Sequence, residues 1–213
     1  MQLSARIAAQ LAHPRGLPGR LLGWAMEIAN ERPVGLAIDE LAPQDDEHIL
    51  DAGCGTGAAL AAVRARAECK LYGIDRSTAM IAAARRRLGH EAELAAEDVK
   101  DMADRWPPFD GVLALNVLYF ADVSGAMAAA LHGSLRDGGR LIVYVTHRET
   151  MERWRFARSG AHRLYDAREL EETLLNGGFQ RALISIEEHR VAPNVRGLIA
   201  RAVRCGDGFA GLG

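Results

Sequence analysis

One aspartate and three glycines dominate the stretch HILDAGCGTGAAL at residues 48–60. Gly53, Gly55 and Gly57 follow an apolar run, so the chain can turn sharply from a strand into a helix and let a ligand approach the backbone. Asp51 comes just before this turn, where its carboxylate would repel a pyrophosphate and attract a cationic group. The G-x-G-x-G spacing also differs from the G-x-G-x-x-G of dinucleotide-binding turns. The stretch predicts a nucleoside site for a ligand whose other end is positively charged.

Two further aspartates end the next two strand-like runs. Asp75 closes KLYGID, where a carboxylate can accept both hydroxyl protons of a ribose. Asp98 closes EAELAAED, where it can accept a proton from the amine of an adenine while a neighbouring backbone N–H meets a ring nitrogen. A ribose without phosphates but with a cationic tail describes S-adenosylmethionine. The alternative interpretation is that these aspartates only cap helices and solvate loops.

Strands and helices alternate through most of the chain. Alternation with apolar strands predicts a parallel sheet covered on both faces, a doubly wound α/β domain whose ligands lie outside the carboxyl ends of the strands. RDGG at 136–139 is expected to be a turn, and a closing hairpin is expected to join one edge of the sheet. The expected strands are 48–53, 70–75, 91–98, 109–116, 140–147, 179–190 and 195–204, and the expected helices are 18–31, 33–41, 58–68, 77–89, 123–135 and 167–176.

Composition bounds the possible partners. With 213 residues, 49% hydrophobic and 25% charged, the chain fits one globular domain with a full core. The formal net charge of -2 gives no overall basic footprint for nucleic acid. The 3 cysteines have no metal-type spacing, which predicts no metal and a cytoplasmic location. No apolar run is long enough to span a bilayer, although the amphipathic first residues leave a transit peptide or a membrane-surface helix open.

The motifs together resemble those of the class I S-adenosylmethionine-dependent methyltransferases. ILDAGCGTG is similar to the first motif of that family, and LYGIDRSTAMIAAARRRL, AAEDVKDM, FDGVLALNVLYFADV and LRDGGRLIVYV follow at its usual spacings, strongly over about residues 36–147. RLYDARELEETLLNGGF is similar to the closing part of the small-molecule branch (methyltransferase type 11), which includes quinone-biosynthesis enzymes. The resemblance implies a Rossmann-like sheet of seven strands, mostly parallel, with helices on both faces and an antiparallel C-terminal hairpin. It also implies a single domain over 1–213, with lid helices in 1–41 and a cofactor-binding core in 42–213.

The same resemblance implies roles for individual residues toward S-adenosyl-L-methionine and its product S-adenosyl-L-homocysteine. Asp51 would face the methionine part, and Asp75 would bind the ribose. Arg76 and Met80 would lie against the adenine, while Asn116 would lie near the methionine moiety. The full predicted cofactor set is Asp51, Ala52, Gly53, Cys54, Gly55, Gly57, Asp75, Arg76, Met80, Asp98, Val99 and Asn116.

Few residues are candidates for catalysis, because methyl transfer mainly requires alignment of the reactants and exclusion of water. A general base is needed only when the acceptor must lose a proton. His147, where the fifth parallel strand ends, is the best-placed base, with a solvated loop histidine as the alternative. Tyr119 and Phe120 can line the site, where an aromatic face favours a sulfonium, or can simply pack.

The acceptor is expected to be a small molecule bound under the N-terminal helices. Residues 116–119 read NVLY, without the prolines of methyltransferases that act on base amines and without the paired glutamates of protein-arginine methyltransferases. Nucleic acid is therefore an improbable partner, and a monomer or homodimer is expected. Three alternatives stay open: a binding or regulatory protein without transfer activity, a nucleic-acid or protein methyltransferase, and a nicotinamide-dependent oxidoreductase, against which Asp51 argues.

Overall fold

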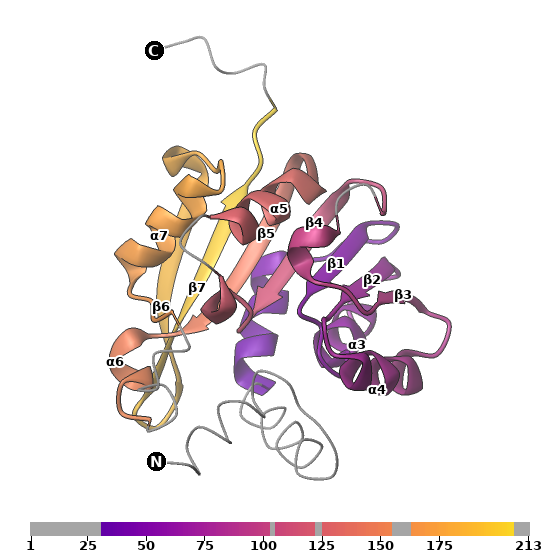
Figure 1. Cartoon of the computed structure of the whole chain (residues 1–213), viewed down its shortest axis with the longest axis horizontal. Helices are drawn as coiled ribbons and strands as arrows, with labels where there is room; N and C mark the ends of the chain where they lie inside the picture. Colours follow the sequence, from indigo (N-terminus) through magenta and orange to yellow (C-terminus); the bar gives the residue numbers. More distant parts are fainter. Residues whose placement is uncertain (1–30, 103–104, 122–124, 155–162, 207–213) are drawn as a thin grey trace.

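The computed structural model describes residues 31–102, 105–121, 125–154 and 163–206 (Figure 1). Its centre is a 7-stranded sheet in the order β3-β2-β1-β4-β5-β7-β6, which Figure 1 shows from right to left. Neighbouring strands from β3 to β5 are parallel, whereas β7 runs antiparallel to both β5 and β6. The predicted seven-stranded sheet with its antiparallel hairpin is therefore confirmed.

The seven strands are close to the expected segments. The inner strands β1, β2, β4, β5 and β7 are mostly buried and apolar, because helices cover both faces of the sheet, whereas the edge strands β3 and β6 are more exposed. Their bounds are β1 His48–Ala52, β2 Lys70–Ile74, β3 Ala92–Ala95, β4 Phe109–Leu115, β5 Leu135–Thr146, β6 Ile184–Ala192 and β7 Val195–Val203.

Two helical layers enclose the sheet. One hydrophobic cluster joins side chains of the helix over 31–41, α3 and α4 to one face, and a second cluster joins α5 and α7 to the other. The helices are 31–41, α3 Ala58–Arg64, α4 Thr78–Leu88, α5 Ala126–Ser134, α6 Arg148–Met151 and α7 Ala167–Asn176, with short 3-10 turns η1 Val99–Asp101, η2 Leu118–Phe120 and η4 Arg181–Leu183.

Helix ends agree with the capping residues in the sequence. The Ser77 side chain accepts a hydrogen bond from the backbone N–H of Met80, and Gly89 ends α4 with a φ of 60°. Asp166 and Glu169 form a reciprocal capping box at the start of α7. These local signals fix the helix boundaries almost to the residue.

Three expectations are corrected by the structure. RDGG at 136–139 lies within β5 instead of preceding it, because Leu135 pairs with Phe109 and pairing resumes only at Arg140 with Gly111. The third strand ends at Ala95, since the following residues turn into η1. The strand expected over 179–190 begins only at Ile184, after η4.

The helix over 31–41 belongs to the packed core. Ala37, Ile38 and Leu41 are almost fully buried against the sheet, and the carbonyl of Leu41 accepts a hydrogen bond from Arg140. The part of the predicted lid that the structure describes therefore packs on the sheet. The rest of the predicted lid, residues 1–30 with most of the expected helix 18–31, lies outside the described residues.

Candidate functional site

The site residues converge where β1 and β4 lie side by side. The chain runs from β1 outward to β2 and β3 on one side, and from β4 outward to β5 on the other. Loops that follow β1 and β4 therefore diverge at the carboxyl edge, which is where open α/β sheets bind ligands. The predicted cofactor residues lie at the ends of β1, β2 and β4 and just after β3.

The glycine turn after β1 is built from left-handed backbone. Gly53, Gly55 and Gly57 have φ values of 80°, 52° and 78°, a region that residues with a Cβ rarely adopt. A Cβ on Gly53 would lie 2.9 Å from Cγ2 of Val117, and one on Gly57 would lie 2.9 Å from Cδ1 of Leu88. A Cβ on Gly55 would meet nothing within 4 Å. Gly55 is thus the glycine whose Cα faces open space, where a ligand can approach the backbone.

Asp51 is a buried carboxyl that accepts no hydrogen bond from any residue the structure describes. Its exposed fraction is 3%, and burial together with the nearby Asp75 raises its pKa to about 7. Buried carboxylates are ordinarily paired or hydrogen-bonded, so an unpaired one at the carboxyl edge of the sheet points to a ligand that supplies a positive charge. An ammonium or sulfonium group is the kind of partner that would stabilise the ionised form.

Asp75 is already held by the backbone on two sides. Its Oδ2 accepts the N–H of Gly55 at 3.0 Å, and its Oδ1 accepts the N–H of Ser77 at 2.7 Å. These bonds fix the carboxylate beside the glycine turn, in an orientation compatible with binding a ribose.

Asp98 serves as a cap in the structure. Its Oδ1 accepts the N–H of Lys100 at 3.1 Å and so begins η1. The following residue, Val99, has a buried side chain, and no described residue accepts a hydrogen bond from its backbone N–H. The capping interpretation is therefore correct for one oxygen, while the second oxygen and the Val99 N–H stay available as an acceptor and donor pair.

Asn116, Tyr119 and Thr146 form a hydrogen-bonded strut between the ends of β4 and β5. Asn116 has a φ of 59°, a strained value for a residue with a side chain, and its N–H donates to the carbonyl of Tyr144. The Tyr119 hydroxyl donates to Oδ1 of Asn116 at 3.0 Å and accepts the N–H of Thr146 at 2.5 Å. Burial raises the pKa of that hydroxyl, so it is poorly suited to act as a base. The geometry gives Tyr119 a positioning contact with Asn116.

Arg76, just after β2, contacts the segment that follows β4. Its guanidinium carbon is 4.8 Å from the centre of the Phe120 ring, a cation–π distance. Arg76 itself is exposed, whereas Met80 and Phe120 are half-buried. The sequence suggested Arg76, Met80 and Phe120 separately, and the structure joins the first and third.

The side chains of Cys54 and His147 are engaged within the protein. The Cys54 thiol packs in the core, where burial raises its pKa, and its N–H donates to the carbonyl of Ile74, so only the backbone of Cys54 borders the site. His147 begins α6: its Nδ1 accepts the N–H of Glu149 at 3.2 Å, and its Nε2 lies 3.8 Å from a carboxylate oxygen of Glu188. The ring nitrogen that would accept a proton is thus already used in a cap.

Sequence reasoning missed several supporting residues. Thr146 and Ser77 contribute backbone N–H groups to the site, and Val117 closes the protein side of Gly53. Neither a motif nor a periodicity marks Thr146 and Val117, because their roles depend on which strand ends meet. Ser77 carried a signal, since it was recognisable as a helix cap next to Asp75.

The polar groups fit a nucleoside with a cationic tail and no phosphate. A Cβ on Gly55 would meet nothing within 4 Å, Asp51 lacks a positive partner among the described residues, and the backbone holds the Asp75 carboxylate beside the glycine turn. In the same ranges no group of three or more metal-binding side chains occurs. Nor does any described helix combine the length and apolar character needed to cross a membrane.

Comparison with known proteins agrees with this geometry. Residues 49–139 match the family described as "Methyltransferase domain". The chain is 33% identical over 144 residues to a "Protein-L-isoaspartate O-methyltransferase" of Methylorubrum populi, covering 66% of this chain and 63% of that protein. It is 33% identical over 129 residues to a "Trans-aconitate 2-methyltransferase" of Pseudomonas aeruginosa, covering 60% of this chain and 44% of that protein. The chain thus spans less than two thirds of the length of these relatives.

A solved structure shares the whole architecture. In the complex of the Haloferax volcanii Trm112 methyltransferase activator with a methyltransferase, the matching chain aligns with a TM-score of 0.75 at 18% identity, over 86% of this chain and 93% of that one. At this identity the likeness concerns the fold, which the strand order and the site geometry independently support. Residues 49–139 thus match the methyltransferase-domain family, and the chain around them has the Rossmann-like fold of solved methyltransferases.

Proposed function

We propose that the protein transfers a methyl group from S-adenosylmethionine to a small-molecule acceptor. The observation that carries the proposal is the buried Asp51 carboxyl beside three left-handed glycines. A phosphate-bearing ligand would be repelled there, whereas the cationic end of this cofactor would compensate the charge.

Each polar group at the carboxyl edge has a role in this proposal. Asp51 binds the charged methionine end, Asp75 the ribose hydroxyls, and Asp98 with the Val99 N–H the adenine edge. Arg76 and Met80 flank the adenine, and Asn116, held by Tyr119, orients the methionine part. When bound, the cofactor supplies a methyl group already activated by its sulfonium. The protein's contribution is alignment and exclusion of water, with no need for a dedicated base.

Two features support a small acceptor over a polymer. The NVLY segment after β4 lacks the proline-containing motif of base-amine methyltransferases, and one relative is named for a small organic acid. A relative named for a protein substrate keeps a protein acceptor as the second candidate. A cytoplasmic location and a monomeric or homodimeric state stay predictions from the sequence.

Calorimetry with S-adenosylmethionine and S-adenosylhomocysteine tests the cofactor part of the proposal. We expect both to bind the wild-type chain and to bind Asp51→Asn much more weakly, because the ligand loses its opposite charge. NAD serves as the control and should give no heat. Absence of binding by both sulfur ligands would overturn the proposal.

A transfer assay separates the remaining alternatives. The protein is incubated with methyl-labelled S-adenosylmethionine and a cell extract, and the label is then separated by size. Label in the small-molecule fraction supports the proposal, and label on protein or nucleic acid contradicts it. Cofactor binding without any labelled product would favour a binding or regulatory protein.

A further inference from the structure

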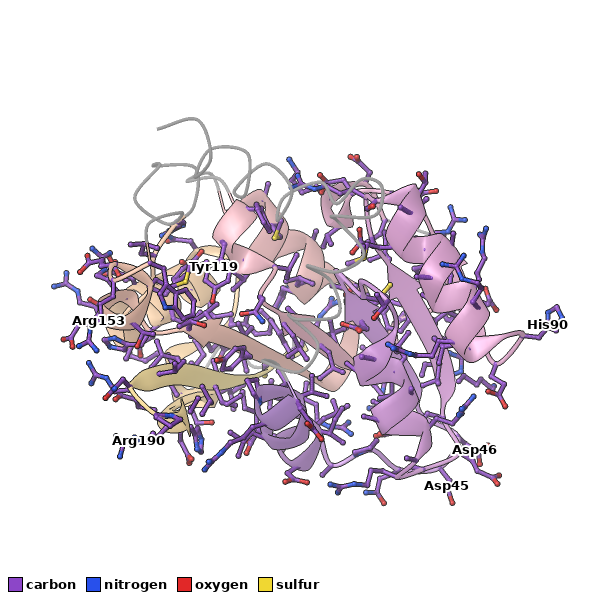
Figure 2. All side chains as sticks on the ribbon, turned by 90° about the horizontal axis from the view of Figure 1, so that it is seen from below. Asp45, Asp46, His90, Tyr119, Arg153 and Arg190 are labelled. Atoms are coloured by element: carbon purple, nitrogen blue, oxygen red, sulfur yellow. The ribbon has the colours of Figure 1, made fainter. Side chains whose placement is uncertain are left out.

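A surface pocket rich in arginine lies on the β6–β7 hairpin, beyond the residues assigned to the cofactor. Its volume is about 520 Å³, and its lining comprises Arg153, Glu188, Arg190, Asn194 and Arg196. Glu188 and Arg190 come from the edge strand β6, Asn194 from the tight turn, and Arg196 from β7. Arg153 lies two residues beyond the end of α6. Figure 2 shows Arg153 and Arg190 at the end of the molecule opposite His90.

The arginines of this pocket differ in how they are paired. Arg196 contacts carboxylates of both Glu188 and Glu149. No carboxylate of the described residues forms an ion pair with Arg153 or Arg190. The two glutamates therefore hold Arg196, whereas Arg153 and Arg190 have no such pairing among the described residues, and the three arginines outnumber the two glutamates at the pocket. This concentration contrasts with the formal net charge of -2 for the chain.

The pocket lies on the same edge of the sheet as the cofactor residues. Because β7 is antiparallel to β5, its first residues pair with the end of β5, as Thr146 does with Gly197. The strut from Asn116 through Tyr119 reaches Thr146, and the next residue, His147, lies 3.8 Å from Glu188 of the pocket. From β4 to β6 there are three strand spacings in the sheet, which is roughly 14 Å. One elongated small molecule can span that distance.

We propose that Arg153 and Arg190 bind the anionic oxygen group, a carboxylate or phosphate, of the methyl acceptor. Guanidinium groups bind such groups through two parallel N–H···O bonds, and the amide of Asn194 offers a further donor at the rim. The inference rests on the proposed methyl transfer. It adds that the acceptor is an organic anion whose charged group is anchored about three strands from the end that receives the methyl group.

Binding of simple anions tests the pocket separately from the transfer reaction. Citrate and inorganic phosphate are titrated into the full-length protein at constant ionic strength, with sodium chloride as the blank. The test variant is Arg153→Gln with Arg190→Gln, and the matched control is Arg168→Gln with Arg181→Gln, which removes the same charge from α7 and η4. We expect citrate or phosphate to bind the wild type and the control, and to bind the test variant at least about tenfold more weakly.

The outcomes distinguish this proposal from the proposed function. S-adenosylhomocysteine should bind equally to the wild type, the test variant and the control. Equal binding also shows that both variants are folded. If the wild type binds neither anion more strongly than chloride, or if the test variant binds like the control, the pocket proposal is overturned while cofactor binding stands. If anions bind as expected but S-adenosylhomocysteine does not, the proposed transfer is wrong instead.

A second measurement connects the pocket to the acceptor. Small molecules of a cell extract are divided by anion exchange into retained and unretained fractions and offered with labelled S-adenosylmethionine. We expect labelled product from the retained fraction, and we expect the test variant to need about tenfold more of that fraction for half-maximal rate, with a similar maximal rate. Product from the unretained fraction alone, or an unchanged requirement, would overturn the proposal.

Discussion

At the amino edge of the sheet the buried Arg140 donates hydrogen bonds from all of its N–H-bearing nitrogens, whereas at the carboxyl edge the buried Asp51 receives none from the described residues. Arg140 binds both carboxylate oxygens of Glu47, at 2.9 and 2.7 Å, and the carbonyls of Leu41, Ala42 and Asp110. Asp51 has only the repulsion of Asp75 to accompany its burial. One buried ionisable side chain of the sheet, Arg140, is thus fully hydrogen-bonded, whereas the other, Asp51, has no hydrogen-bond partner among the described residues.

The difference separates residues that hold the fold from residues that await a ligand. A fully hydrogen-bonded buried charge stabilises one arrangement of the elements around it, here β1, β4, β5 and the end of helix 31–41. A buried charge without a partner lowers stability and is retained only where something else compensates it. Removing Arg140 should therefore damage folding, and removing the Asp51 charge should improve stability while damaging binding.

The largest effect is expected for Arg140→Met. This change leaves Glu47 buried without its partner and several carbonyls without donors, so we expect a loss of about 3–5 kcal/mol in the free energy of unfolding. Urea denaturation followed by circular dichroism measures it. Arg168→Met, which removes an exposed ion pair on α7, is the control and should show no measurable change.

Asp51→Asn should increase the free energy of unfolding at neutral pH, whereas Arg140→Met should decrease it. Burial raises the pKa of Asp51 in the folded chain to about 7 from its ordinary value of 3.8, so between these pH values the folded chain holds a proton that the unfolded chain has lost. Wild-type stability should therefore fall as pH rises from about 4 to 7, by on the order of 2–4 kcal/mol, and the Asn variant should lack this contribution. Parallel pH series of urea denaturation, compared as a difference, measure the effect.

The same titration should appear in ligand binding. A cationic ligand group favours ionised Asp51, so affinity of the wild type for S-adenosylhomocysteine should decrease as pH falls below about 7. Affinity of Asp51→Asn should be low and flat over this range. A wild-type affinity that does not change with pH would show that Asp51 does not interact with the charged group of the ligand.

Asp75→Ala should weaken S-adenosylhomocysteine binding by about 1–3 kcal/mol, because ribose hydroxyls lose their acceptor. Asp110→Ala is the matched control at the amino edge: Asp110 also accepts a backbone N–H, that of His48 at 2.8 Å, and pairs with Arg136. Both variants should lose stability, but only the first should lose affinity in calorimetry. Equal affinities would show that Asp75 merely shapes the turn.

The two edges also differ in how far the sequence predicts them. Asp51, the alternating glycines and Asp75 are local signals, since strand ends and turns are defined by neighbouring residues, and the structure brings them together as expected. The strut of Tyr119 and Thr146 joins residues 27 positions apart, and the Arg140 network joins residues more than 90 apart. Such contacts depend on which strands become neighbours. The capping contacts of His147 and Asp98 are local instead, each made to a residue two positions further along the chain, and the alternative interpretation of the aspartates includes the second.

Tyr119→Phe should have a smaller effect that reaches the cofactor indirectly. Losing the hydroxyl leaves the buried N–H of Thr146 without its acceptor and removes one hydrogen bond from the side chain of Asn116, so we expect stability to fall by about 1–2 kcal/mol and S-adenosylhomocysteine affinity to fall a few-fold. Tyr165→Phe removes a hydroxyl that donates to the carbonyl of Leu118 at 2.9 Å without touching Asn116. It should lower stability alone. If Tyr119→Phe and Tyr165→Phe bind S-adenosylhomocysteine equally well, Tyr119 does not position Asn116 for the cofactor.

The smallest effect is expected for His147→Asn, which tests whether the carboxyl edge contains a base at all. Asparagine is a good helix cap and can accept the N–H of Glu149 as the imidazole does, so α6 should keep its start. Because the proton-accepting Nδ1 is occupied in that cap, we expect the rate of labelled methyl transfer to the retained anionic fraction to change by less than about threefold. A general base would contribute about a hundredfold or more. A loss of that size with unchanged stability would make His147 catalytic, and would require its ring to leave the cap before the acceptor can react.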